Sequence, residues 1–309
     1  MSEPLMAGRQ AQPGSRVRPQ TMLAVSVVIP AYNEEGGVVE AVRRVSQAFL
    51  REEWPHEIIL VNDCSTDSTA GRLRELTGRV QVVTHEINRG YGASLLSGIR
   101  RARYDVIAII DADGTYPYEE LPMLVRQLEG TDMVVGARLG PGSRGPWMRR
   151  PAKWLLGQLA NYLTGQRIPD LNSGMRVMRR PIVMQFRRLL PPNFSFTTTI
   201  TLAMLTNQYA VRYVPITYQR RIGRSKIHPV RDTFNFLQLI IRTVMYFAPL
   251  KVFLPLSLSL LAGTIASGVM DVRANNLTDK TVFFFIGFMM TLAIGCLADL
   301  IDKRLGVSE

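Results

Sequence analysis

Apolar runs alternate with amphipathic stretches between residues 23 and 138. The runs are rich in valine and isoleucine and are bounded by polar residues, a pattern that predicts strands buried on both faces. The stretches between them carry apolar residues at helical spacing. Strands are expected over residues 23–30, 56–63, 79–85, 105–113 and 132–138, and helices over residues 35–52, 69–76, 93–103 and 119–128. Strands joined by helices in this order predict an α/β domain whose sheet is mostly parallel.

A different pattern begins after residue 230. Residues 252–270 and 281–298 contain no charged residue. As helices, each would extend about 27–29 Å, close to the thickness of the hydrocarbon core of a bilayer. The connector between the two runs is short and polar. We therefore expect a transmembrane hairpin over residues 250–300, and a pair of buried core helices is the alternative.

Basic residues predict the orientation of this hairpin, because lysine and arginine are enriched in cytoplasmic loops near membrane spans. Arg273 and Lys280 lie in the connector, but more basic residues flank the spans on the side of the chain ends. These are Arg231, Arg242, Lys251, Lys303 and Arg304. We therefore expect an integral membrane protein whose α/β domain and terminal residues 301–309 are cytoplasmic, in the plasma (inner) membrane if the cell is bacterial.

Two further segments complete the predicted domain organisation. Residues 229–249 have apolar residues at helical spacing with arginines interleaved, which indicates an amphipathic helix in the membrane interface, or alternatively a core helix. Residues 1–22 are rich in Pro, Gly, Gln and Arg and contain no apolar run, so we expect a disordered tail and not a secretory signal. The α/β domain is then expected to occupy residues 23–228.

The charge of the chain narrows the classes of partner. A net charge of +12 over 309 residues predicts an anionic partner, which could be nucleic acid, phospholipid or a phosphorylated small molecule. Nucleic-acid binding would explain the charge but not the apolar spans, so no nucleic-acid partner is expected. Cys64 and Cys296 are far apart in the sequence, which excludes a disulfide framework and a zinc-type spacing.

An acidic pair follows one of the predicted strands. Asp111 and Asp113 are one residue apart, so in an extended segment their side chains point the same way. Such carboxylates repel each other unless a cation lies between them, and hard oxygen ligands suit Mg²⁺ or Mn²⁺. Capping of a turn is the alternative, although the preceding isoleucines and Gly114 favour a metal site. Ligands of such sheets bind at the carboxyl ends of the strands.

The motifs together resemble a known family. VVIPAYNEE, VNDCSTDST, NRGYGASLLSGIRRA, IIDADGTYP and VVGAR, in this order and spacing, resemble the family 2 glycosyltransferases of the GT-A fold, which is Rossmann-like. NSGMR, RRIGRSK and the C-terminal hairpin are similar to the polyprenyl-phosphate glycosyltransferases, the group that includes dolichol-phosphate mannose synthase. The resemblance covers about residues 23–300.

The resemblance implies an activity. A single hexose would move from a UDP- or GDP-sugar to undecaprenyl or dolichyl phosphate, with inversion and with Mg²⁺ or Mn²⁺, on the cytoplasmic membrane face. The attacking lipid phosphate is already an anion, so a strong general base is dispensable, and no Ser-His-Asp set is visible in the sequence. The resemblance leaves the sugar, the base and the oligomeric state open.

The resemblance also implies roles for single residues. Asp111 and Asp113 match metal-binding positions, with Asp111 also near the ribose. The positions that match nucleotide-sugar contacts are Pro30, Tyr32, Glu34 and Asp63. The remaining catalytic positions match Arg138, Arg220 and Lys226, and Ser225 matches a contact to the acceptor phosphate. The basic residue of the acceptor loop aligns best with Lys153, with Arg149 and Arg150 as the alternatives. Arg176 is expected at the acceptor end together with Asp170, and a structural ion pair between them is the alternative. Thr115 replaces the glutamine of related synthases, which leaves a third metal ligand open.

Two other functions are compatible with the same motifs. The acceptor could be a glycolipid or a growing polysaccharide, although processive synthases of this fold carry a QxxRW motif that this chain lacks. The protein could also be a non-catalytic scaffold that binds a nucleotide sugar. The presence of Asp63, Asp111, Asp113 and Arg220 argues against a scaffold.

Overall fold

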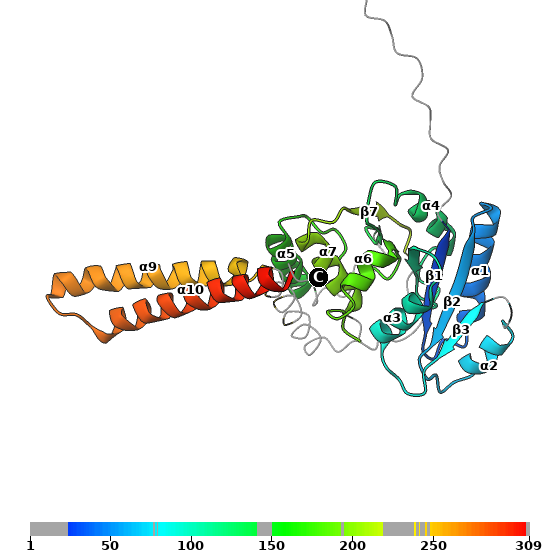
Figure 1. The fold of residues 1–309 in the computed structure, drawn as a ribbon, viewed down its shortest axis with the longest axis horizontal. Helices are drawn as coiled ribbons and strands as arrows, with labels where there is room; N and C mark the ends of the chain where they lie inside the picture. The colour runs from blue at the N-terminus through cyan, green and yellow to red at the C-terminus, as the bar shows by residue number, and fades with distance from the viewer. Residues whose placement is uncertain are drawn as a thin grey trace, which may run out of the picture.

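The structure, a computed structural model, describes residues 24–76, 78, 80–140, 150–192, 195–218 and 248–306, with positions 238, 241 and 245 between the last two ranges. It consists of an α/β domain and a long two-helix hairpin that projects from one end of that domain (Figure 1). The predicted tail over residues 1–22 and most of the predicted interfacial helix over residues 229–249 lie outside the described residues.

The described strands form one seven-stranded sheet in the order β3-β2-β1-β4-β6-β5-β7. The strands are β1 (Val25–Ala31), β2 (His56–Asn62), β3 (Gln81–Thr84), β4 (Val106–Ile109), β5 (Met133–Ala137), β6 (Arg176–Arg179) and β7 (Val211–Pro215). Every pairing is parallel except those of β6, which runs antiparallel to both β4 and β5. The predicted, mostly parallel α/β sheet is therefore confirmed, whereas β6 and β7 were not predicted.

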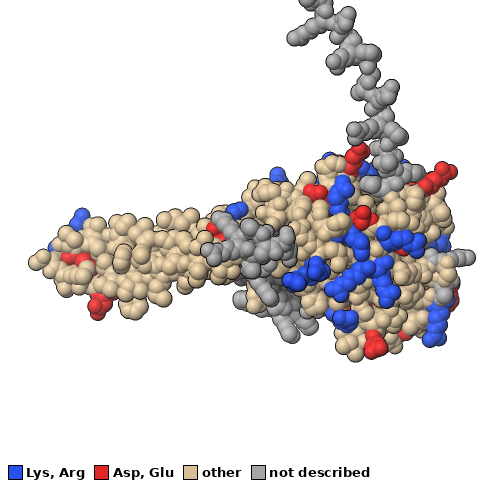
Figure 2. Space-filling view, viewed as in Figure 1, with Lys and Arg blue, Asp and Glu red and all other residues tan. Residues whose placement is uncertain are grey.

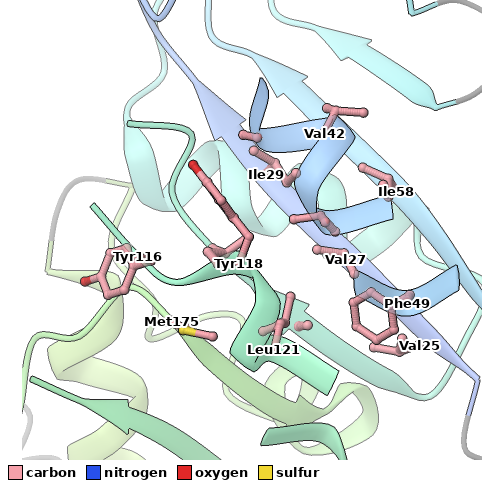
Figure 3. Packing of buried hydrophobic residues seen from close by; sticks show 14 of the residues in the cluster. Val25, Val27, Ile29, Val42, Phe49, Ile58, Tyr116, Tyr118, Leu121 and Met175 are labelled. Carbon is pink, nitrogen blue, oxygen red and sulfur yellow. The ribbon is translucent and has the colours of Figure 1, made fainter. Parts of the chain in front are cut away.

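Two hydrophobic clusters cover the two faces of this sheet. On one face α1 (Val38–Arg51), α2 (Thr69–Arg74), η1 (Tyr118–Glu120) and α4 (Leu121–Arg126) pack against strand residues such as Val27 and Ile29 (Figure 3). On the other face α3 (Tyr91–Arg101), α6 (Arg180–Gln185) and α7 (Phe196–Thr206) pack against Val28 and Ile59. Successive residues of β1 therefore enter opposite clusters, and burying each stabilises the fold by about 1.5–3 kcal/mol.

The hairpin consists of α9 (Leu250–Ala274) and α10 (Asp279–Gly306). Two segments, Leu250–Ala274 and Asp279–Ile301, are long and apolar enough to cross a membrane, and only 6% of the most apolar window of each is buried. This exposure is incompatible with the alternative of two buried core helices. Figure 2 shows that charged side chains are almost absent from the visible sides of the hairpin and gather at its tip and on the α/β domain.

Helix α5 (Arg150–Thr164) joins the α/β domain to the hairpin. The Nζ atom of Lys251, in the first turn of α9, donates a hydrogen bond to the Leu163 carbonyl at 2.7 Å, and the Tyr162 hydroxyl donates to the Lys251 carbonyl at 3.4 Å. Ala160 and Leu163 form a small apolar cluster against which Val252 packs. The base of α9 is therefore attached to the α/β domain through side chains of α5.

Candidate active site

The loops that follow β1 and β2 are joined by side-chain hydrogen bonds. Asn33 Oδ1 accepts from the backbone N–H of Thr66 at 2.8 Å, and the Asn33 N–H donates to Ser65 Oγ at 3.1 Å. Asn33 has φ of 55° and Cys64 has φ of 58°, in the left-handed region that non-glycine residues seldom adopt. Strained backbone of this kind persists where surrounding contacts fix it, often at functional sites. The carboxyl edge of the sheet is therefore a pre-shaped surface.

The residues expected to hold the nucleotide lie along this edge. Pro30 is inside β1 and opposite Val61 of β2, and Tyr32 follows at the strand end with 37% of its surface exposed. The Glu34 N–H donates to Thr69 Oγ1 at 2.9 Å. A Cβ atom added to Gly37 would lie 2.5 Å from the Ala112 carbonyl oxygen, so the start of α1 closely approaches the acidic loop. The structure thus brings the VVIPAYNEE motif beside the loop that carries Asp111 and Asp113.

Asp63 is buried and is bound by the loop that precedes α3. Its carboxylate accepts hydrogen bonds from the backbone N–H groups of Arg89 and Gly90, each at 2.8 Å, and from His85 Nδ1 at 2.7 Å. His85 Nε2 lies 2.9 Å from Ser97 Oγ. The structure therefore forms a Ser-His-Asp arrangement that the sequence did not reveal, because its members are distant in the chain. Its carboxylate also binds backbone, which indicates a supporting role.

Asp111 and Asp113 lie beyond β4 and not within it. The predicted strand over residues 105–113 is wrong at its end, since β4 ends at Ile109. The chain turns away from the sheet because Gly114 adopts φ of +75° and Tyr118 bridges the turn. The Tyr118 hydroxyl donates to the Asp111 carbonyl at 3.0 Å and accepts from the Gly114 N–H at 3.1 Å. The two carboxylates are therefore carried by a tight turn at the carboxyl edge.

Three tyrosines surround this acidic turn. The Tyr91 hydroxyl donates to Asp111 Oδ1 at 2.8 Å, and the Tyr116 hydroxyl accepts from the Gly174 N–H at 2.6 Å. Burial first, and then the negative charge of Asp111, raises the pKa of Tyr91 and of Tyr116. Burial also raises the pKa of Tyr118. All three hydroxyls stay protonated at neutral pH, so Tyr91 and Tyr118 remain hydrogen-bond donors. None of them was predicted, although Tyr91 and Tyr116 fall within the motifs NRGYGASLLSGIRRA and IIDADGTYP, and Tyr118 lies one residue beyond the second.

The acidic turn suits a hard divalent cation. Asp113 Oδ1 accepts from Thr115 Oγ1 at 2.6 Å and from the Thr115 N–H at 3.2 Å, so Thr115 orients the carboxylate. A Cβ atom added to Gly174 would lie 2.5 Å from Asp111 Oδ2, so glycine keeps this carboxylate uncrowded. In the part of the chain that the structure describes, no three His, Cys, Asp or Glu side chains form a cluster that could hold a metal ion. An ion would therefore take two carboxylates from the protein and further oxygens from its ligand or water.

Arg138 forms a buried ion pair with Asp170. Its Nε and NH2 atoms donate to the two carboxylate oxygens at 2.7 and 2.9 Å, and the Arg138 N–H adds a third bond at 3.0 Å. Burial opposes both charges, but the paired hydrogen bonds outweigh it, so the pKa of Asp170 is lowered and that of Arg138 is raised. The guanidinium also lies over the Tyr218 ring, 5.4 Å from its centroid. The positive charge of Arg138 is therefore largely compensated by Asp170.

Arg176 does not take the place expected of it. The alternative, an ion pair between Arg176 and Asp170, is not formed either, because Asp170 pairs with Arg138. Arg176 is fully buried, and its guanidinium donates to the carbonyls of Ser173 and Leu171 and to Thr201 Oγ1. Burial lowers its pKa. These bonds use the guanidinium to join β6 to α7 beneath the site, so in this structure it has no surface that could contact an acceptor phosphate.

Four predicted acceptor-side residues are not placed by the structure. Arg220, Ser225 and Lys226 lie outside the described residues, and the side chain of Lys153 in α5 is not described. Their roles stay predictions.

Comparison with known proteins gives a consistent result. The sequence model of Glycosyl transferase family 2 matches residues 26–187. An undecaprenyl-phosphate 4-deoxy-4-formamido-L-arabinose transferase of Pseudomonas fluorescens is 31% identical over 242 residues, which are 76% of this chain and 68% of that protein. The low-salt glycan biosynthesis hexosyltransferase Agl6 of Haloferax volcanii is 30% identical over 220 residues, which are 69% of this chain but only 52% of that protein.

Solved structures share the fold. A glucosyl-3-phosphoglycerate synthase from Mycobacterium tuberculosis, in complex with Mn²⁺, uridine diphosphate and phosphoglyceric acid, superposes with a TM-score of 0.57 at 19% identity. The match covers 72% of this chain and 78% of that one.

Proposed function

The chain belongs to glycosyl transferase family 2, and from this premise we propose that it moves one hexose from a UDP- or GDP-sugar to a polyprenyl phosphate at the cytoplasmic face of a membrane. The proposal depends on one observation above the others. An oriented acidic turn lies at the carboxyl edge of the sheet, in a chain that also carries two exposed, membrane-length apolar helices. The first feature suits a metal-bound diphosphate, and the second suits a lipid acceptor.

The comparisons support the two halves of this proposal separately. The Pseudomonas relative is named for transfer to undecaprenyl phosphate. The solved synthase of the same fold was crystallised with Mn²⁺ and uridine diphosphate. In this chain, the loops after β1 and β2 would hold the base and ribose through Tyr32 and Glu34, with Asp63 supporting the neighbouring loop before α3. Asp111 and Asp113 would lie under the diphosphate.

The reaction requires little proton transfer. An oxygen of the lipid phosphate attacks the anomeric carbon of the sugar as the bond from that carbon to the diphosphate breaks. The nucleoside diphosphate leaves, and the configuration of the anomeric carbon is inverted. A divalent ion, when bound, supplies positive charge near the leaving group. Asp111 and Asp113 would hold that ion, with Tyr91 and Thr115 orienting the two carboxylates through their hydrogen bonds. The acceptor is ionised at neutral pH, so the Asp63-His85 pair is not required as a base.

The acceptor side is proposed from the sequence. Lys226, Ser225 and Arg220 would bind the lipid phosphate or the diphosphate, and Lys153 of α5 would approach the same headgroup. Because α5 holds the base of α9, an acceptor whose chain lies in the bilayer would present its phosphate near this helix. This arrangement favours a lipid-linked acceptor over a soluble one.

A donor and acceptor panel tests the function. Purified full-length protein in detergent with Mn²⁺ or Mg²⁺ is offered UDP- and GDP-hexoses with undecaprenyl or dolichyl phosphate, and lipid products are identified by mass spectrometry. We expect a polyprenyl-phosphate hexose with one donor class, and no product when the metal is removed with EDTA. Transfer only to a glycolipid or polysaccharide would replace the proposed acceptor. Donor binding without transfer to any acceptor would favour the scaffold.

Orientation of the hairpin is tested separately. The short connector between α9 and α10 is expected outside the cytoplasm, so a cysteine replacing Asn276, in a variant whose free Cys64 and Cys296 are both serine, should react with a membrane-impermeant maleimide in intact cells. A matched cysteine replacing Ser68 of the α/β domain should react only after lysis. The reverse labelling pattern would place the active site on the other side of the membrane.

A further inference from the structure

We propose that the beginning of α3 is a positioning relay that connects Asp63 to Asp111, and that Tyr91 is the positioning residue at its end. The relay consists of Ser97, His85, Asp63, Gly90 and Tyr91. This inference rests on the proposed function, because it assigns the relay the task of holding Asp111 for the metal.

The first part of the relay is the support of the Asp63 carboxylate. His85 is buried between Asp63 and α3, with Nδ1 2.7 Å from Asp63 Oδ1 and Nε2 2.9 Å from Ser97 Oγ. With the Nδ1 proton directed at the carboxylate, the Nε2 atom accepts from the serine hydroxyl. Ser97 lies within α3, so this histidine connects the carboxylate to the body of the helix.

The second part is the chain reversal that begins α3. The Arg89 and Gly90 N–H groups donate to Oδ1 and Oδ2 of Asp63 respectively. Gly90 has φ of 92°, a left-handed conformation in which a side chain would be strained. Asn88 Nδ2 donates to the Asp63 carbonyl at 3.3 Å. Asp63 therefore determines where the first residue of α3 is placed.

The third part is Tyr91 itself, which is that first residue. Its hydroxyl donates to Asp111 Oδ1 at 2.8 Å. The Asp111 carboxylate is consequently held at Oδ1 by Tyr91, while Gly174 closely approaches Oδ2. With one oxygen fixed, the direction that the other presents to a cation is also fixed. Ligand orientation by such supporting hydrogen bonds typically changes metal affinity by about 10–100-fold.

The relay predicts different routes by which substitutions at Tyr91 and at His85 change metal affinity. Tyr91 touches a proposed metal ligand, so its effect on the metal could be local. In the part of the chain that the structure describes, the two ring nitrogens of His85 bond to Asp63 and Ser97, and neither bonds to Asp111. A substitution at His85 must therefore act on metal affinity through the backbone of residues 89–91, and this distinguishes a relay from two independent contacts.

Metal binding provides the test. Mn²⁺ binding to the purified full-length protein with saturating UDP or GDP is measured by electron paramagnetic resonance, independently of turnover. We expect Tyr91→Phe to raise the Kd for Mn²⁺ about tenfold, and to leave nucleotide affinity in EDTA unchanged. Tyr209→Phe is the matched control, because it removes a tyrosine hydroxyl whose bond to Gln185 lies on the protein surface, and it should bind Mn²⁺ like the wild type.

The second pair of variants tests the distant part. His85→Ala should weaken Mn²⁺ binding several-fold, and His85→Asn, whose amide can donate from near the position of Nδ1, should restore most of it. If Tyr91→Phe binds Mn²⁺ with wild-type affinity, Tyr91 is not a positioning residue. If both His85 variants alter only nucleotide affinity, no relay exists. If the wild-type protein fails to bind Mn²⁺ in the presence of either UDP or GDP, the proposed function and the relay are both rejected. Normal Mn²⁺ binding by the wild type and by the variants rejects the relay alone, so failure of the proposed function and failure of the relay are distinguishable.

Discussion

Replacing Asp113 by asparagine should lower the rate of hexose transfer by about 10²–10³-fold, with little change in thermal stability. The substitution preserves the shape of the side chain and a carbonyl oxygen for the Thr115 hydroxyl, but it removes a negative charge that a divalent ion requires. Loss of one carboxylate also relieves repulsion with Asp111, so folding should not suffer. The measurement is initial rate against Mn²⁺ concentration, together with the midpoint of thermal unfolding.

Asp105→Asn is the matched control for this variant. Asp105 is exposed and precedes β4 at the end of the strand opposite to the acidic turn. Its replacement makes the same change of charge on the same segment and should leave the transfer rate close to that of the wild type. An Asp113→Asn protein that transfers hexose at the normal rate and with normal metal dependence would remove the acidic turn from the mechanism.

Replacing Asp170 by asparagine should give the largest loss of stability, about 3 kcal/mol in the free energy of unfolding. Breaking a buried pair from one side leaves an uncompensated charge, which typically costs about 3–5 kcal/mol. The carboxylate side chain of Asp170 is 6% exposed and the side chain of Arg138 is 20% exposed, so solvent screens this pair only slightly. The lower end of the range applies because an asparagine oxygen can still accept from the Arg138 N–H. Transfer should also fall, since the freed guanidinium changes the charge near the site.

Asp132→Asn provides the comparison for stability. Asp132 lies 3.8 Å from Arg179 in a pair whose side chains are 28% and 40% exposed, and such pairs contribute about 0–1 kcal/mol. Comparable destabilisation by the two variants would show that the Arg138–Asp170 pair is not buried in solution.

The pH dependence of the wild type has a definite sign. The folded-state pKa of Asp170 lies below its ordinary value of 3.8 because the bonds from Arg138 outweigh the effect of burial. Its contribution to stability is therefore complete above that ordinary value and is lost as the pH falls through the lowered folded-state pKa. Asp170→Asn should flatten this part of the acid unfolding curve. An unchanged acid limb would assign the loss of stability to other carboxylates.

The local sequence pattern was sufficient to predict those features of the fold that depend on residues close together in the chain. Valine and isoleucine runs predicted the parallel core strands, because residues such as Val27 and Val28 must enter clusters on opposite faces. Two charge-free runs predicted the exposed hairpin. The strand-end motifs predicted which edge of the sheet carries the acidic residues, since carboxyl ends of parallel strands share one edge.

Several parts of the site could not be predicted from local pattern. The strand over residues 105–113 was expected to continue to Asp113, but the turn is made by Tyr118, and its hydroxyl bonds are tertiary. Arg176 was assigned to the acceptor end, but β6 inserts between β4 and β5 and carries this arginine into the interior. The alternative ion pair of Arg176 with Asp170 was also wrong, because Asp170 pairs with Arg138, which lies 32 positions away in the sequence.

The sequence by itself determined the parallel α/β core, the membrane-length hairpin and the identity of the acidic pair, because these follow from burial and charge along contiguous segments. Only the tertiary structure decided which cation neutralises Asp170, which hydroxyl holds Asp111 and which histidine supports Asp63. Each of these contacts joins segments that the sheet order brings together. Hydrogen bonds act over about 3 Å, so their partners are known only when the path of the chain is known.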